Sequence, residues 1–277
     1  ESELQADARA SGVNISDVQG NLVIKEVIAK GGSARDGING NDASAAAEGM
    51  SDASVSGNIT MDKIAAIGGT ASGKSSDTTA YAYGSYNEAG TQNYGNITMS
   101  EVEATAGDSL YASAFAYGIN SNDGASTTIA ALTANVKATG TTNANATRHQ
   151  TYAYGLSNTD STVNITGAVD ITAAIVTTVG HPDVGAYAVL TANPYYGGAV
   201  TNINTAGGNT VKLVGDVVAY SNGINNIVLD NEDAYLQGNI LNTTATNTKG
   251  TGTNNITITN DASWLPVFDN RNGSFIV

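Results

Sequence analysis

Apolar and polar residues alternate with a period of two in several short segments, and these segments recur along the chain. The first kind begins Gly-Asn-aliphatic and occurs at 20–24, 57–61 and 95–99, in steps of 57 − 20 = 37 and 95 − 57 = 38 residues. Relatives of it lie at 163–166 and 255–259. A two-residue period is typical of a strand with one buried face, so each segment predicts a short β-strand.

A second motif, aromatic-Ala-Tyr-Gly, recurs with nearly the same period. Its copies at 81–84, 115–118 and 152–155 end in glycines that are 118 − 84 = 34 and 155 − 118 = 37 residues apart. A looser copy lies at 186–189, and Gly49 precedes Gly84 by 35 residues. A third alternating segment lies between the two motifs, at 101–107, 135–139 and 169–173. Each period therefore predicts three short strands separated by turns.

These repeats predict an all-β fold, a right-handed parallel β-helix (solenoid) with three short strands per rung and variable loops. One rung buries too little to be stable alone, so its neighbours must complete its core and satisfy its backbone hydrogen bonds. Roughly seven or eight rungs are expected as a single domain over 1–277. An N-terminal cap or first rung is expected at about 1–19, and a C-terminal cap or fragment end at about 255–277. After residue 180 the strand spacing shortens to about 20–25 residues, which predicts shorter loops.

The composition agrees with this fold and excludes several partners. Charged residues make up 13% of the chain, and 11 basic residues against 25 acidic ones give a net charge of −14. This balance excludes a basic stripe for nucleic acid. Cysteine is absent, so the chain has neither disulfides nor thiolate metal ligands. No stretch has the roughly 18 apolar residues of a membrane-spanning helix, and the start at Glu1 favours a mature or excised segment.

The Asn-Ile-Thr strands, the Ala/Gly/Thr-rich coils and the closing Asn-Asp-Ala-Ser-Trp at 260–264 resemble the passenger domains of bacterial autotransporters. The resemblance covers nearly the whole chain and is mostly compositional and periodic. The membrane barrel of that family is absent from this sequence. The resemblance implies a right-handed parallel β-helix exposed on a bacterial outer surface. Most such passengers serve adhesion, aggregation or display, and some carry protease or esterase domains.

Aromatic residues recur at equivalent positions and are the candidate ligand-binding side chains: Tyr81, Tyr83, Phe115, Tyr117, Tyr152, Tyr154 and Tyr187. In-register stacking would place them about 4.8 Å apart as a column. An outward column would contact sugar rings or another copy, and an inward column would be part of the core. Phe115 favours burial, whereas Glu48, at the position equivalent to Tyr83, favours exposure.

Other candidate chemistry is sparse. His149 and His181 each lie alone in a polar loop, without metal-ligand spacing. Residues 36–42 resemble a calcium loop loosely, but the closing bidentate Glu is missing. The carboxylates that a β-helix glycosidase or lyase would need are Glu101, Glu103, Asp62 and Asp170. Their alternation favours a solvated face, so we expect no catalytic residues, metal or cofactor.

The sequence favours a non-enzymatic structural adhesin or scaffold, located outside the cell or on a bacterial cell surface. Its expected partners are a host or bacterial surface glycan or protein, or another copy of itself. Nucleic acid and a membrane-spanning role for this segment are not expected. Two alternatives stay open at this stage: a carbohydrate-active β-helix enzyme, and a self-assembling fibre subunit joined through its ends.

Overall fold

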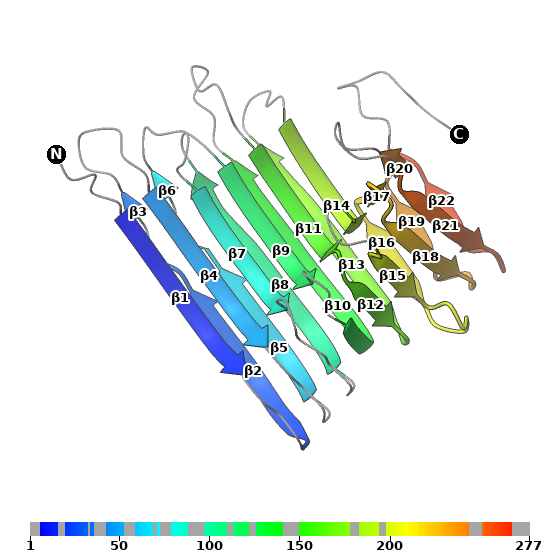
Figure 1. Cartoon of the computed structure of the whole chain (residues 1–277), viewed down its shortest axis with the longest axis horizontal. Coiled ribbons are helices and arrows are strands. Elements are labelled where there is room, and N and C mark those ends of the chain that lie inside the picture. Colours follow the sequence, from blue (N-terminus) through cyan, green and yellow to red (C-terminus); the bar gives the residue numbers. More distant parts are fainter. Residues whose placement is uncertain are drawn as a thin grey trace.

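The structure is a computed structural model of the whole chain. It describes residues 6–15, 20–32, 34–35, 43–52, 59–68, 71–72, 79–87, 97–109, 113–121, 126–140, 150–177, 183–193, 198–243 and 251–267. These residues form 22 β-strands in two sheets, and every strand pair is parallel (Figure 1). The prediction of an all-β fold of parallel strands is confirmed.

The first sheet has eight strands, and it collects one strand from each repeat. Its spatial order is β1 (Ala6–Ile15), β4 (Ala43–Asp52), β7 (Thr79–Asn87), β9 (Ser113–Ser121), β11 (Gln150–Thr159), β14 (Asp183–Ala192), β17 (Asp216–Tyr220) and β20 (Ile240–Thr243). Spatial order therefore follows chain order. We call each of these strands, together with the strands that follow it before the next one, a layer.

The second sheet has fourteen strands and takes the rest of each layer. It contains β2 (Leu22–Lys30), β3 (Ala34–Arg35), β5 (Ile59–Ile67), β6 (Ala71–Ser72), β8 (Ile97–Ser109), β10 (Ser126–Gly140), β12 (Thr162–Ile165), β13 (Val169–Thr177), β15 (Val200–Ile203), β16 (Val211–Val214), β18 (Ile224–Leu229), β19 (Tyr235–Gln237), β21 (Thr253–Ile258) and β22 (Ser263–Leu265). In the third and fourth layers one long strand, β8 or β10, replaces two shorter ones.

The Asn-Ile-Thr segments lie directly beside one another, as their period predicts. Strand pairing aligns one aliphatic residue from each layer in a single column: Leu22, Ile59, Ile97, Ile129, Ile165, Ile203, Ile227 and Ile256. The spacing from Ile59 to Ile97 is 97 − 59 = 38 residues, and from Ile203 to Ile227 it is 227 − 203 = 24. From Ile227 to Ile256 it is 256 − 227 = 29, so the spacing after residue 180 is shorter as expected, but only the first of these two steps lies within the predicted 20–25 residues.

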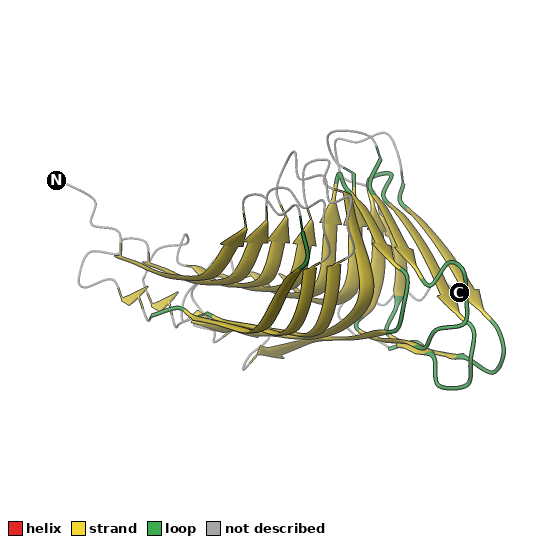
Figure 2. Cartoon of the chain, turned by 90° about the horizontal axis from the view of Figure 1, so that it is seen from below, coloured by secondary structure: helices red, strands yellow, loops and turns green. Residues whose placement is uncertain are grey.

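The two sheets face each other across one narrow core (Figure 2). Side chains from both sheets meet in it, with Ala116, Ala153 and Leu156 from the first and Val136 and Ile171 from the second all fully buried. Small residues line much of the first sheet, so the opposite sheet approaches closely. The part of the chain that the structure describes has no helix that is long and apolar enough to cross a membrane.

Candidate binding face

The described tyrosine side chains of the aromatic-Ala-Tyr-Gly motif lie on the outer face of the eight-stranded sheet. Ala116 and Ala153 are 0% exposed and belong to the core. The residues that follow them, Tyr117 and Tyr154, are half-buried. Because neighbouring residues of a strand point to opposite faces, the tyrosines point away from the core. This answers, for the described side chains, the question of direction that the sequence leaves open.

Strand pairing aligns the motif residues in two adjacent columns. One column runs Glu48, Tyr83, Tyr117, Tyr154, Tyr187 and Asp216. The other runs Ala46, Tyr81, Phe115, Tyr152 and Gly185. Of the candidates, Tyr81, Tyr83 and Phe115 have described backbones, but their side chains lie outside the described residues. All seven candidates occupy the register positions that their period predicts.

The described rings form a continuous stack, which we call the tyrosine ladder (Tyr117, Tyr154, Tyr187 and Tyr152). The centroids of Tyr117 and Tyr154 are 4.6 Å apart, with ring planes at 9°. Tyr154 and Tyr187 follow at 5.1 Å and 27°. Tyr152 lies 5.7 Å from Tyr154 and 5.9 Å from Tyr187. Such pairs contribute about 0.5–1.5 kcal/mol each beyond their area burial, so the ladder also stabilises the stack of layers.

A glycine shapes the end of the ladder. Gly185 continues the Tyr152 column in the next layer. A β-carbon at this position would collide with the far end of the Tyr187 ring. The absence of a side chain therefore allows Tyr187 to lean across and close the gap beside Tyr152.

The ladder geometry limits what a ligand can contact. Two nearly parallel rings 4.6 Å apart leave no room for a third ring between them. A bound partner must therefore contact the outer edges of the rings. Acidic residues occupy the two register positions that flank the column, because Glu48 precedes Tyr83 and Asp216 follows Tyr187. The Asp216 carboxylate accepts a hydrogen bond from the Asn239 backbone N–H at 2.8 Å.

The predicted carboxylate candidates lie on the fourteen-stranded sheet, and Asp62 and Asp170 are exposed. Asp62 is on β5 and Asp170 is on β13, and β8 and β10 lie between these strands. At about 4.8 Å per strand the two are roughly 14 Å apart, beyond the ~5–9.5 Å separation of glycosidase carboxyl pairs. Glu101 and Glu103 are on β8, and their side chains lie outside the described residues, as do His149, His181 and 36–42.

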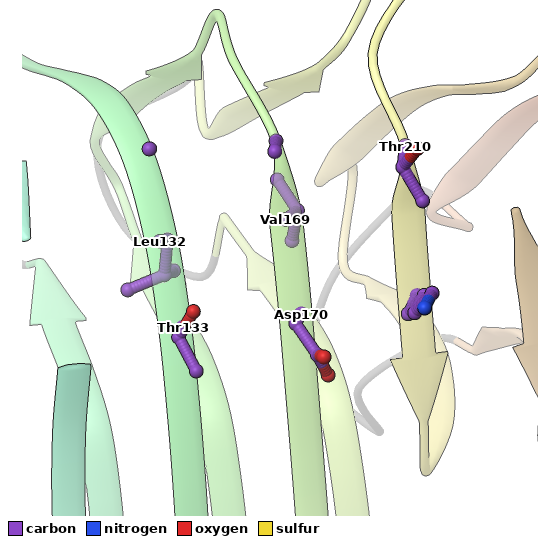
Figure 3. Close-up of a pocket in the computed structure, with 8 residues that line it drawn as sticks. Leu132, Thr133, Val169, Asp170 and Thr210 are labelled. Carbon is purple, nitrogen blue, oxygen red and sulfur yellow. The ribbon is translucent and has the colours of Figure 1, made fainter. Parts of the chain in front are cut away.

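A shallow hollow of about 210 Å³ lies around Asp170 on β10, β13 and β16 (Figure 3). Its lining is Ala131, Leu132, Thr133, Ala168, Val169, Asp170, Thr210 and Lys212. Strand pairing places Asp170 between Thr133 and Lys212, so the hollow offers one carboxylate and one ammonium group. It is smaller than the ~300–1,000 Å³ of most small-molecule sites. Within the described ranges no three His, Cys, Asp or Glu side chains cluster as metal ligands would.

The sequence analysis missed a string of hydrogen-bonded polar side chains at the corner between the two sheets, which is buried from Asn158 to Asn225 and reaches the surface at Asn242. We call it the polar string: Asn158, Thr201, Thr191, Asn225, Asn254 and Asn242. The Asn158 amide donates to the Thr201 hydroxyl at 3.0 Å, and the Thr191 hydroxyl donates to Asn225 Oδ1 at 2.6 Å. Because each hydroxyl has one proton, the Thr201 hydroxyl donates to Thr191. All donors therefore point in one direction along the string.

A second asparagine ladder lies on the outer face of the fourteen-stranded sheet. We call it the outer asparagine ladder (Asn164, Asn202, Asn226 and Asn255). Each side-chain amide donates to the side-chain carbonyl of the preceding layer, at 2.7, 2.8 and 2.9 Å. The repeated Asn before the aliphatic column was the available signal for this ladder.

Comparison of the chain with models of protein families, with curated proteins and with solved structures finds no match. The candidate face therefore has to be judged on its own geometry. The tyrosine ladder is the largest aromatic feature among the described side chains, and its rings are accessible on an outer face.

Proposed function

We propose that this chain is the rod of a structural adhesin or scaffold that works outside the cell, on a bacterial surface. The proposal includes a right-handed parallel β-helix with three strands per turn. Its support is the eight-layer register of the aliphatic column and the strict parallel order of both sheets. The autotransporter passenger identity belongs to the same proposal and depends on the repeats and on the segment 260–264.

One observation carries the adhesive role: the tyrosine ladder is partly exposed on an outer face. Tyrosine combines a wide apolar body with a polar tip, which is why it is enriched in binding surfaces. The partner class is a surface glycan or protein that lies along the ring edges.

Replacing Tyr154 with alanine tests this role, because Tyr154 is in contact with three other rings of the ladder. We expect about a tenfold loss of affinity for the partner, since truncating an anchor side chain costs more than about 1 kcal/mol. The measurement is binding of the whole chain to a glycan array, followed by titration against the glycan that binds best.

The matched control is Tyr154→Phe, which keeps the ring and removes the hydroxyl. Weak binding by both variants assigns the recognition to the phenol hydroxyl, and normal binding by the phenylalanine variant assigns it to the ring. Unchanged binding by Tyr154→Ala, with a normal circular dichroism spectrum, contradicts the proposed face. Release of reducing sugar by the wild-type chain from any bound polysaccharide would replace the adhesin with the enzyme alternative.

A further inference from the structure

The hollow around Asp170 lies where the fourteen-stranded sheet divides into two branches (Figure 3). Strand β10 pairs with both β12 and β13, and each of these strands begins its own row of further strands. Residues 166–168 and 204–210 carry the chain from one branch to the other in the next two layers. Ala131 and Ala168 line the hollow at this point, and their short side chains leave about 210 Å³ of open space.

Two unlike charges line the hollow side by side. Strand pairing places Asp170 directly opposite Lys212, on strands that lie about 4.8 Å apart. Asp170 is exposed and Lys212 is half-buried. Opposite charges at such positions often attract one another across a sheet. Among the described residues, however, the Asp170 carboxylate and the Lys212 ammonium group form no hydrogen bond or ion pair, so both are available to a ligand.

The rest of the lining is neutral, and most of it is aliphatic. Leu132 and Val169 belong to the core and line the hollow as well, together with the two alanines. Two threonines complete the lining. Asp170 and Lys212 are therefore the only charged groups of the described lining, and a small aliphatic group of a ligand would find apolar surface beside them.

We propose that this hollow binds a free α-amino acid with a small aliphatic side chain. The ammonium group of the ligand would pair with Asp170 and its carboxylate with Lys212. The two charged groups of such a ligand are attached to one carbon, at bond lengths of about 1.5 Å, so they suit protein charges on adjacent strands. Its side chain would contact Ala168 and Val169. The site lies on the other sheet from the tyrosine ladder, so it goes beyond the adhesive role and does not depend on it.

Ligands with another charge pattern fit the hollow less well. A dicarboxylate would bring a negative charge to Asp170, and a diamine would bring a positive charge to Lys212, and like charges in contact disfavour binding. An uncharged sugar could donate and accept hydrogen bonds here, but it would supply no counter-ion to either group. Water competes well for the hydrogen bonds of an exposed carboxylate, so a ligand that carries both charges is favoured.

The test compares valine with two ligands that each lack one of its charges. Isovalerate has the same aliphatic group and carboxylate but no ammonium group, and isobutylamine has the ammonium group but no carboxylate. Each ligand is titrated into the whole chain, and binding is followed through the backbone amide NMR signals of residues 168–170 and 210–212. We expect a Kd of about 1 mM for valine, a ligand of few atoms in an open site, and about tenfold weaker binding of the other two.

Two variants separate the contributions of the two charges. Asp170→Asn should weaken valine binding about tenfold and leave isovalerate binding unchanged, because isovalerate uses only Lys212. Lys212→Met should weaken valine binding to a similar extent and leave isobutylamine binding unchanged. Asp62→Asn is the matched control, because Asp62 is an exposed aspartate elsewhere on the same sheet, and this variant should bind valine as the wild type does.

A variant that fills the hollow gives an independent check. Ala168 is exposed, so Ala168→Leu should keep a normal circular dichroism spectrum while its larger side chain abolishes valine binding. A wild-type chain whose amide signals do not respond to valine at about twenty times the expected Kd overturns the proposal. So does equal affinity for valine and isovalerate, or valine binding that Asp170→Asn and Ala168→Leu leave intact.

Discussion

Replacing Asn225 with leucine is expected to lower the free energy of unfolding by about 3 kcal/mol, because three hydrogen bonds of a buried side chain are lost at ~1 kcal/mol each. Asn225 is 0% exposed and lies at the centre of the polar string. It accepts a hydrogen bond from Thr191 at 2.6 Å and donates to the Val218 carbonyl at 3.0 Å and to Asn254 at 2.7 Å. Leucine has the same branching at Cγ and is larger than asparagine, so the substitution leaves no cavity, and the loss reports the hydrogen bonds together with any overpacking. The measurement is the urea unfolding midpoint followed by circular dichroism.

The neighbouring residue provides the control. Asn226 belongs to the outer asparagine ladder, where it donates to Asn202 at 2.8 Å and accepts from Asn255 at 2.9 Å. Its side chain is only half-buried, so water replaces the lost bonds, and Asn226→Leu should cost less than about 1 kcal/mol. Equal decreases in the free energy of unfolding for the two variants would mean that water reaches the Asn225 side chain as it reaches Asn226. The corner between the sheets would then be hydrated.

The repeat period could be predicted from the sequence because the fold is periodic in the same way. Any residue that recurs every 34–38 positions must lie beside its equivalents if the strands pair in register. Ile129 was nevertheless missed as a member of the aliphatic column. Thr128 precedes it where every other copy has Asn, so the motif is not recognisable in that layer.

The direction of the tyrosine column could not be predicted, since residue size gives the wrong answer. Alternation shows that Tyr154 and Ala153 point to opposite faces, and the larger apolar residue normally faces the core. Here the two sheets approach so closely that alanine and glycine fill the inner positions, which leaves the tyrosines outside. The sheet separation depends on both sheets together, and a single strand does not encode it.

The polar string could not be predicted from the sequence either, because it too depends on how several layers pack together. In 224–227 the pattern Ile-Asn-Asn-Ile contains one inward and one outward asparagine, and asparagine is usual in turns. Asn225 is buried because Thr191 and Asn254, 34 and 29 residues away, satisfy its amide. The partners of a buried polar group come from other layers, so local pattern alone does not identify them.

The glycine of the aromatic-Ala-Tyr-Gly motif is expected to be as important for stability as the tyrosines are for binding. A β-carbon at Gly155 would collide with Cγ2 of Ile171 from the opposite sheet and lie 2.8 Å from the Ala188 carbonyl oxygen. Gly118 is similar, because a β-carbon there would lie 2.9 Å from Cγ2 of Val136. Glycine therefore sets the close approach of the two sheets in these layers.

Gly155→Ala should lower the free energy of unfolding by about 2–3 kcal/mol, since overpacking a closed core costs ~1–3 kcal/mol. Gly20→Ala should have the opposite sign and stabilise by about 0.5 kcal/mol, because its β-carbon meets nothing within 4 Å and the unfolded chain loses entropy.

Ile171→Leu moves the branch point of this side chain away from Gly155. The double variant Gly155→Ala with Ile171→Leu should therefore lose less than the sum of the two single losses in urea unfolding. Additive losses would show that the sheets can separate locally and that the glycine does not set their distance.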